Sequence, residues 1–416
     1  MQKRFKLITL VIISLLLASF LFSSCTIINN QTYENSSAGE FVDTVQSTLP
    51  EDKQNDDLYK VLAYIDYLYQ ENYVGEIDKE KLITDIMNAY IASVGDKYGM
   101  YYSPDMVKEL FNGFQGVKTG LGIYVKGTLE NDGIKILAVM NGSPAKNAGL
   151  KDGEIIFEIG NVLVKDVGYE KALDMLVGEP GSIISLGVKV VEGTEEKVRR
   201  VDVIRAEFEA QAVYYHRYAL DQSIGVIRVL DFTDAMPKQF KSAVNDLLER
   251  GCTSIVFDVR SNTGGTLDSC IEVLDFLLPE GTLAKILDAK GEVVETYSSS
   301  EGSIDVPMAV LTDGYTASAA ELFTCALKDY GVATIVGTKT YGKGCMQHIL
   351  ELPSGGALRY TTNYFNGPTS ENFDGIGITP DVVIELDESL KNKNMFEISD
   401  LEDNQLQKAC EQLLNN

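Results

Sequence analysis

A serine in a strand-to-helix segment offers the first candidate for chemistry. Ser318 lies in Asp313-Gly-Tyr-Thr-Ala-Ser-Ala-Ala-Glu321, after an apolar run typical of a buried strand and before a predicted helix. A hydroxyl at such a junction is exposed at the carboxyl edge of a sheet, where free helix N–H groups can stabilise a developing oxyanion. Ser318 and Glu321 also form a Ser-x-x-Glu capping box, so this segment taken alone favours a serine that only caps a helix.

A serine hydroxyl is a weak nucleophile and needs a base, and here lysine is the best candidate. The chain has two histidines, His216 and His348, so neither a histidine base nor a histidine zinc site is expected. Lys343 lies between Gly342 and Gly344 with no acidic residue nearby in the sequence. A lysine acts as a base only when desolvation keeps it neutral. A lone Gly-Lys-Gly is more often a surface turn, and that alternative stays open at this point.

A glycine pair offers a place for an anion. The segment Arg260-Ser-Asn-Thr-Gly-Gly265 directly follows an apolar run that predicts a buried strand. Paired glycines allow backbone N–H groups to point at one anion. The alternative is a turn that starts a helix and holds no ligand.

Taken together, these segments resemble the C-terminal processing peptidases, also called tail-specific proteases, over about residues 58–415. In that family the nucleophilic serine lies in a run of small residues before a glutamate, as Ser318 does. The general-base lysine lies 25 residues later in a Tyr/Phe-Gly-Lys-Gly loop, which matches Lys343. A glutamine four residues further on orients the lysine, which matches Gln347. The resemblance implies a serine endopeptidase with a Ser–Lys acyl-enzyme mechanism and no metal or cofactor.

The resemblance also assigns the oxyanion hole. The Asn-Pro-Gly-Gly turn of the family appears here with Thr263 in place of proline, and its Gly264 would supply one N–H group. The N–H group of Ala319 would supply the other. The segment Gly375-Ile-Gly-Ile-Thr-Pro-Asp381 resembles the closing motif of the family.

The predicted contact between Lys343 and Gln347 requires a particular backbone conformation. On a straight strand, Lys343 and Gln347 share a face but lie about 13 Å apart, at 3.3 Å per residue. The two side chains can therefore meet only if the chain bends at Gly344.

Short strands and glycine-rich turns between about residues 115 and 205 resemble a PDZ domain. Gly142–Gly153 resembles the turn and helix of that domain, and Gly120-Leu121-Gly122-Ile123 resembles its carboxylate-binding loop. By resemblance, the loop N–H groups hold a peptide C-terminus while the peptide adds as a strand to the sheet edge. Val177 stands where the family usually has arginine. If that arginine links the position of the PDZ domain to the active site in relatives, such a link is open to question in this chain. A purely structural β domain is the alternative.

The order of the periodic patterns predicts an α/β fold class, more fully a multidomain α+β chain. Residues 57–114 have apolar residues at helical spacing. Residues 206–390 alternate strands with helices, which predicts a parallel or mixed sheet with chemistry at strand-to-helix turns. By resemblance this part is a crotonase/ClpP-like peptidase core with the PDZ-like domain of residues 115–205 inserted before it. Residues 391–416 form a helical tail.

The N-terminus is typical of a bacterial lipoprotein signal. Basic residues precede an apolar run, Leu7–Phe22, which Ser23-Ser24-Cys25 follows. We expect residues 1–24 to be removed, Cys25 to be lipidated and residues 25–56 to form a disordered tether. The apolar run is short of the roughly 20 residues of a spanning helix, although an uncleaved anchor remains the alternative. Either places the protein on the outer face of the cytoplasmic membrane or in the cell envelope.

The net charge indicates which partners the protein can bind, and the cysteine spacing indicates whether it holds a metal. The chain has 36 basic and 61 acidic residues, a net charge of −25 that repels phosphate backbones and argues against nucleic acid. The expected partners are proteins or peptides with free C-termini and, through the lipid, the membrane; a homodimer stays open. Apart from Cys25, five cysteines remain with no CxxC pair and no metal-ligand spacing, so we expect buried free thiols. The alternative functions are a non-catalytic ligand-binding scaffold and a small-molecule acyl hydrolase.

Overall fold

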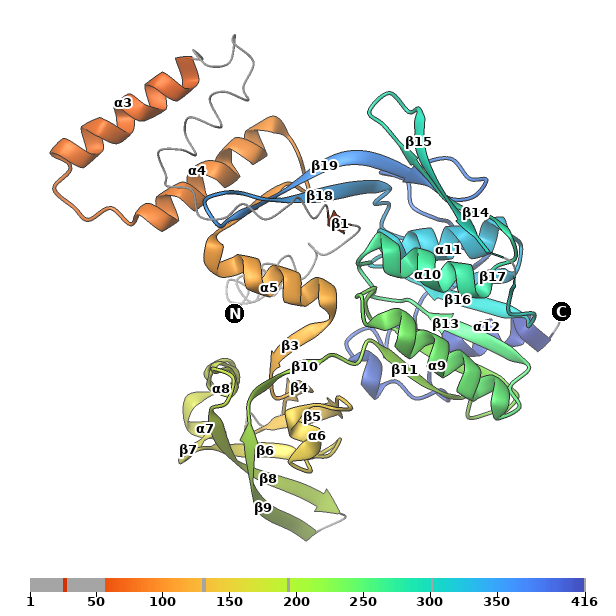
Figure 1. Cartoon of the computed structure of the whole chain (residues 1–416). Coiled ribbons are helices and arrows are strands. Elements are labelled where there is room, and N and C mark those ends of the chain that lie inside the picture. The colour runs from red at the N-terminus through yellow and green to blue at the C-terminus, as the bar shows by residue number, and fades with distance from the viewer. Residues whose placement is uncertain (1–24, 28–56, 129–131, 193–194, 301, 415–416) are drawn as a thin grey trace. The chain divides into compact units, whose positions relative to one another are not determined.

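The computed structural model of the chain describes residues 25–27, 57–128, 132–192, 195–300 and 302–414 (Figure 1). These residues belong to two compact units. Unit 1 contains residues 111–346 and the chain from residue 363 onward, and unit 2 contains residues 25–110 and 347–362. The predicted signal segment, residues 1–24, and most of the predicted tether, residues 28–56, lie outside the described residues.

A mainly parallel sheet forms the centre of unit 1. Its strand order is β11-β12-β13-β16-β17-β20, and all neighbours are parallel except β11, which is antiparallel to β12. All five residues of β13 and of β16 are buried because helices cover both faces, which explains why three or four consecutive residues in each strand are apolar. The strands are β11 (Val213–Arg217), β12 (Ile224–Val229), β13 (Ser254–Asp258), β16 (Met308–Thr312), β17 (Ala333–Gly337) and β20 (Val382–Val383).

Helices form layers on the two faces of this sheet. Three helices bury their apolar sides against one face, where the larger core of the unit lies (Figure 1). A fourth helix, at the C-terminal end, packs on the opposite face with Leu406 and Leu413 among its buried residues. The three helices are α9 (Met236–Glu249), α10 (Leu267–Leu277) and α11 (Ala319–Asp329), and the fourth is α12 (Asn404–Leu414), preceded by the short 3-10 helix η1 (Met395–Glu397).

A second, antiparallel sheet with its own apolar core occupies residues 117–209. Its strand order is β4-β5-β6-β8-β9, so β4 and β9 are edge strands, and a separate ribbon pairs β3 with β10. The strands are β3 (Val117–Gly120), β4 (Ile123–Gly127), β5 (Ile134–Val139), β6 (Ile155–Ile159), β7 (Val162–Leu163), β8 (Ile183–Glu192), β9 (Glu195–Ile204) and β10 (Ala206–Glu209). The helices are α6 (Pro144–Asn147), α7 (Val164–Val167) and α8 (Tyr169–Leu176).

The remaining strands of unit 1 extend beyond the parallel sheet. Antiparallel β14 (Gly281–Leu287) and β15 (Val293–Ser299) form a hairpin, and β14 also pairs with the end of β19 (Ala357–Asn366). β18 (Cys345–Glu351) begins in unit 1 and continues into unit 2.

Unit 2 contains helices α3 (Asp57–Asn72) and α4 (Lys79–Val94), strand β2 (Met100–Tyr102) and most of α5 (Pro104–Gln115). Asp78 caps the N-terminus of α4, where its side chain accepts the N–H of Lys81. Strand β1 (Cys25–Ile27) pairs in parallel with Gln347–Ile349, which differs from the prediction of a disordered tether starting at residue 25. An edge strand has open backbone groups that an extended segment can pair with.

The predicted α/β fold class, with a PDZ-like domain beside the peptidase core, is confirmed. The expectation of buried free thiols is also confirmed for Cys252, Cys270, Cys325, Cys345 and Cys410. Within the described part of the chain, no helix is both long and apolar enough to cross a membrane.

Candidate active site

Ser318 lies at the junction between β16 and α11, with its side chain fully buried. Its backbone angles, φ 57° and ψ −118°, are rare for a residue other than glycine. An ordinary N-cap residue has extended angles, so the conformation of Ser318 is not that of a simple cap. Strained angles of this kind persist only where the surroundings hold them in place.

The turn before Ser318 is held by a carboxylate. Oδ1 of Asp313 accepts the N–H groups of Tyr315 and Thr316, each at 2.9 Å. The same oxygen accepts the N–H of Ser261 at 2.9 Å, from the turn after β13. Asp313 therefore joins the serine turn to the glycine-pair turn at the carboxyl edge of the sheet.

Gly264 is in direct contact with the serine segment. A Cβ built on Gly264 would lie 2.9 Å from the Cβ of Ser318 and 2.9 Å from the nitrogen of Ala319. Its φ of 106° also requires glycine. The predicted oxyanion residues Gly264 and Ala319 are thus brought together with Ser318. The N–H of Gly264 donates to Oδ1 of Asn262 at 2.8 Å, so in this structure it is engaged within its own turn.

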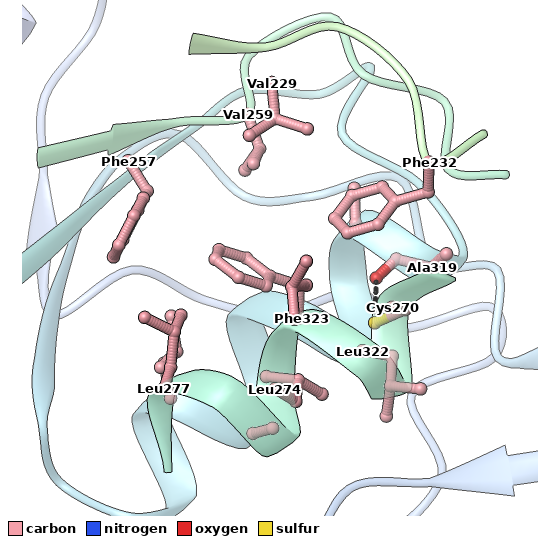
Figure 2. Close-up of a cluster of buried hydrophobic side chains, with 14 of the residues drawn as sticks. Val229, Phe232, Phe257, Val259, Cys270, Leu274, Leu277, Ala319, Leu322 and Phe323 are labelled. Atoms are coloured by element: carbon pink, nitrogen blue, oxygen red, sulfur yellow. Dashed lines mark hydrogen bonds between the residues drawn. The ribbon is translucent and has the colours of Figure 1, made fainter. Parts of the chain in front are cut away.

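Ala319 is supported from the core below it. The carbonyl oxygen of Ala319 accepts a hydrogen bond from Sγ of Cys270 on α10, at 3.3 Å (Figure 2). Burial raises the pKa of the Cys270 thiol, which keeps it protonated as a donor. Leu274 of α10 and Phe323 of α11 lie in the same apolar cluster. The first turn of α11 therefore rests on closely packed side chains.

Lys343 lies in the loop between β17 and β18, with an exposed fraction of 3%. The predicted closing motif, residues 375–381, contacts this loop directly through backbone atoms. The N–H of Gly375 donates to the carbonyl of Gly342 at 2.9 Å, and a Cβ on Gly342 would lie 2.8 Å from the nitrogen of Gly377. Glycine is required at such a close approach. This contact gives the closing motif a structural role beside the predicted base.

On its other side, the Lys343 loop is bound to Glu321 of α11. Oε2 of Glu321 accepts the N–H of Lys343 at 2.7 Å, and Oε1 accepts the N–H of Gly342 at 2.7 Å and the hydroxyl of Thr340 at 2.5 Å. Oε2 also accepts the N–H of Ser318 at 2.9 Å. Glu321 is fully buried, and burial raises the pKa of its carboxyl group although all four donors favour the charged form. One carboxyl group thus bridges the two predicted catalytic segments.

Gln347 lies in β18 and belongs to unit 2, where it is fully buried. Its Nε2 lies 3.4 Å from Oγ1 of Thr361, which donates in turn to Asp96 at 2.8 Å. Lys343 precedes β18 and is not part of the strand, so the straight-strand separation does not apply to the pair. The contact of Gln347 with Lys343 stays a prediction.

The predicted carboxylate-binding loop of residues 120–123 connects β3 with the edge strand β4. The carbonyl of Leu121 accepts the N–H of Ala145 at 2.8 Å, and the carbonyl of Gly122 accepts the N–H of Met140 at 3.0 Å. A Cβ on Gly122 would lie 2.3 Å from the Cβ of Ser143, so only glycine fits there. The loop is therefore fixed through its carbonyl groups.

Strand β4 and helix α8 lie next to each other in this domain. A Cβ on Gly127 of β4 would lie 3.2 Å from the ring of Tyr169 of α8. Ile123 of β4 and Leu173 of α8 are half-buried and pack against the same apolar core. An edge strand beside a helix is the arrangement that a PDZ domain uses to add a peptide strand.

Sequence reasoning missed an arginine at the end of α8. Val177, which replaces the usual arginine of the family, is 75% exposed. Arg205 instead donates to the carbonyls of Met175 and Leu176, at 2.9 Å each, and to Oγ of Ser182 at 3.0 Å. In the sequence, Arg205 is marked only by its position directly after a predicted strand. That position does not identify a residue that caps a helix.

A buried charge network behind the Gly264 turn was also missed. Asp258 is bonded by both Arg228 and Arg260, and Arg260 is bonded to Asp403 ahead of α12. Burial alone would raise the pKa of Asp258, but Arg260 and Arg228 hold it well below its ordinary value. Arg228 also donates to the carbonyl of Met395 at 3.1 Å, so both arginines anchor the C-terminal segment to the strand ends that carry the site.

A cavity of about 690 Å³ opens beside these turns. Ser261 lines it from the turn after β13 and Tyr315 from the turn after β16, while Tyr124 lines it from β4 and Phe396 from η1. The ring of Phe396 lies 4.9 Å from that of Tyr124, centre to centre. No group of three or more His, Cys, Asp or Glu side chains placed to hold a metal ion occurs among the described residues.

Comparisons with known proteins match both halves of this description. The model of peptidase family S41 matches residues 223–384, and that of the PDZ domain matches residues 114–196. A carboxy-terminal-processing protease of Bartonella bacilliformis is 32% identical over 349 residues, which cover 82% of this chain and 78% of that protein. A carboxyl-terminal-processing protease of Picosynechococcus is 31% identical over 299 residues, 71% of each chain. A solved structure from Bacteroides fragilis, described as an S41 protease, shares the fold with a TM-score of 0.50 and 20% identity, over 75% of this chain and 90% of that one.

Proposed function

Because the chain belongs to peptidase family S41 and is a serine peptidase with a PDZ domain, we propose that Ser318 and Lys343 form its catalytic pair. In this proposal the enzyme is an endopeptidase that processes proteins near their C-termini. The PDZ domain holds the free terminus, and the α/β core cuts the chain.

The observation that carries the proposal is the shared oxygen Oε2 of Glu321. It accepts the N–H of Ser318 at 2.9 Å and the N–H of Lys343 at 2.7 Å, so the two nitrogens are at most 5.6 Å apart. Residues 25 positions apart in the chain are thereby neighbours. A lysine can serve a serine as base only if the two side chains reach hydrogen-bond distance, and backbones this close allow them to do so.

The state of the lysine fits the role of a base. Lys343 has an exposed fraction of 3%, and burial favours the neutral form of an amine. A neutral Nζ can accept the proton of the Ser318 hydroxyl as Oγ attacks the carbonyl carbon of the scissile peptide. The C–N bond then breaks, the proton passes to the leaving amine, and an ester on Ser318 remains.

The second half of the reaction regenerates the enzyme. Lys343, again neutral, accepts a proton from water, whose oxygen attacks the ester carbonyl. The C–O bond breaks, the proton returns to Oγ of Ser318, and the new carboxylic acid leaves. In both halves the N–H of Ala319 lies at the start of α11, where it can bind the oxyanion together with a donor from the Gly264 turn.

Substrate capture is assigned to the loop of residues 120–123. Its backbone N–H groups would hold the terminal carboxylate, and the peptide would pair with the edge strand β4, beside α8. Peptides with free C-termini are the substrates that this arrangement selects.

The proposal extends to location. Lipid on Cys25 would tether the enzyme to the outer face of the cytoplasmic membrane or within the cell envelope. The support is the sequence of the first 25 residues, with basic residues, an apolar run and Ser-Ser-Cys.

The test of the function is mass spectrometry of denatured and native envelope proteins after incubation with wild-type enzyme or with Ser318→Ala. We expect wild type alone to remove C-terminal segments. Cleavage by the variant at the same sites would show that Ser318 is not the nucleophile.

A further inference from the structure

The four hydrogen bonds to Glu321 use its carboxyl group completely. Each oxygen accepts two donors: Ser318 N–H and Lys343 N–H on Oε2, and Gly342 N–H and the Thr340 hydroxyl on Oε1. An ionised carboxylate has about four acceptor positions and no proton to donate. An amide or a protonated acid offers fewer acceptor positions, so only the carboxylate satisfies all four donors.

These donors come from two segments that are otherwise separate in the chain. One is the strained residue Ser318 at the start of α11, and the other is the loop from Thr340 to Lys343. Glu321 itself lies in the first turn of α11, where helix geometry fixes its backbone. The carboxylate therefore sets the position of the loop relative to the helix that carries the nucleophile.

We propose that Glu321 is the positioning residue of the active site, which fixes the spacing of Ser318 and Lys343 through their backbone N–H groups. The inference rests on the proposed Ser–Lys pair. Glu321 contacts neither substrate nor the reacting atoms in this role. Displacements of about 1 Å in such a pair cost about 100-fold in rate.

The charge of Glu321 also acts on its neighbours. Two titratable residues lie next to it: Lys343, whose backbone N–H is bound to Oε2, and Cys325, one turn further along α11, whose thiol interacts with its charge. A carboxylate near Lys343 favours the ammonium form and so shifts the base toward higher pH. Replacing the carboxylate with an amide should therefore move the ascending limb of the pH–rate profile to lower pH.

The experiment compares Glu321→Gln with Glu321→Asp and with a matched control on the same helix. The control is Asp329→Asn, because Oδ2 of Asp329 accepts the N–H groups of Thr369 and Ser370, at 2.8 Å each, at the other end of α11. For each variant, kcat and KM for a peptide with a free C-terminus are measured as functions of pH, together with the thermal unfolding midpoint.

We expect Glu321→Gln to lower kcat about 100-fold with KM within threefold of wild type, and to move the ascending limb down by about half to one pH unit. Glu321→Asp keeps the charge but is shorter, so kcat should fall while the limb stays in place. Asp329→Asn should lower the thermal unfolding midpoint but leave kcat and the position of the ascending limb of the pH–rate profile unchanged. A Glu321→Gln enzyme with kcat within threefold of wild type, or with an unmoved limb, would overturn the inference.

A milder variant covers the case in which Glu321→Gln does not fold. Thr340→Val removes one donor from Oε1, together with the acceptor of the Ile378 N–H, and leaves the carboxylate charged. We expect kcat to fall about threefold to tenfold at constant KM, and an unchanged kcat would contradict the inference. If Ser318→Ala is inactive while the Glu321 and Thr340 variants are normal, only the positioning role fails. If Ser318→Ala is active, the catalytic pair itself is wrong.

Discussion

Gly264 and Ser318 meet so closely that a single added carbon on Gly264 would lie 2.9 Å from the Cβ of Ser318. Backbone atoms on both sides, including the carbonyl oxygen of Ala317 at 2.8 Å, leave that carbon no room. Gly264 is thus required by the serine segment itself, in addition to any N–H group that it supplies to a substrate.

Gly264→Ala should therefore lower kcat/KM by at least about 100-fold, because the serine turn has to move. The control is Gly251→Ala, which shares a positive φ of 88° but has open space around its Cβ position. It should cost about 1 kcal/mol of unfolding free energy and leave kcat/KM unchanged. Equal activity of the two variants would show that the contact at Gly264 is not needed for catalysis.

Ser318→Ala and Lys343→Met should each abolish nearly all turnover, and the double variant should be little worse than either. In the proposed mechanism both residues act in the same proton transfer, so removing either one would remove the whole step. Steady-state kinetics on one peptide measure all three. Defects that multiply in the double variant would mean that the two residues act independently. Arginine is unsuitable at position 343 because it cannot act as a neutral base.

Amidation of a substrate peptide at its C-terminus should raise KM about tenfold or more. The N–H groups of residues 120–123 would lose a charged acceptor, and such hydrogen bonds contribute about 1.5–3 kcal/mol. The matched control peptide is acetylated at its N-terminus and keeps the free carboxylate. Equal cleavage of the amidated and the free peptide would contradict recognition of the terminus.

Asp231 should make the protein less stable as the pH rises. Burial raises the pKa of this half-buried carboxyl group to about 7, with Lys118 opposing the shift. An unfolded aspartate ionises near pH 4, so between about pH 4 and pH 7 the unfolded chain binds fewer protons and the stability falls.

Asp231→Asn removes this dependence. It should gain about 2 kcal/mol of unfolding free energy at pH 8 and almost nothing at pH 4, measured by urea unfolding at both values. The exposed Asp202→Asn serves as the control and should show no such difference. A gain of the same size at both pH values would argue against a titrating Asp231.

Cys25→Ala should release the protein from membranes or leave it with an uncleaved signal, because the lipid would have no acceptor thiol. Fractionation of cells and electrophoretic migration measure both outcomes. A variant that fractionates and migrates like wild type would rule out lipidation at Cys25.

The segments of the proposed catalytic pair could be located in the sequence because the patterns that mark them are local. Ser318 and Lys343 each lie among small or glycine residues, and the distance of 25 residues between them made the combination specific. Glu321 was interpreted as one half of a capping box, and its bond to the N–H of Ser318 is present. Its bonds to Gly342 and Lys343 join residues more than 20 positions apart, which no local pattern shows.

Other parts of the site depend on still longer separations. The bond of Arg260 to Asp403 links residues 143 positions apart, and it forms only once α12 covers the sheet. Val177 indicates that the usual arginine is absent, but Arg205, which caps α8 from the residue between β9 and β10, could not be found by spacing. Conversely, the bond between Gly264 N–H and Asn262 is a local turn typical of asparagine and was overlooked in favour of the oxyanion role.

The hairpin of β18 and β19 is closed at its base on the same loop that carries Lys343. The N–H of Phe365 donates to the carbonyl of Gly344 at 3.0 Å, and Nδ2 of Asn372 donates to the carbonyls of both Gly344 and Phe365 at 2.8 Å. The chain thus leaves the Lys343 loop and returns to it at one fixed point. Because these bonds fix the base of the hairpin, its turn near residues 352–356 can change in length or sequence during evolution while Lys343, and Gln347 in the first half of β18, stay where they are.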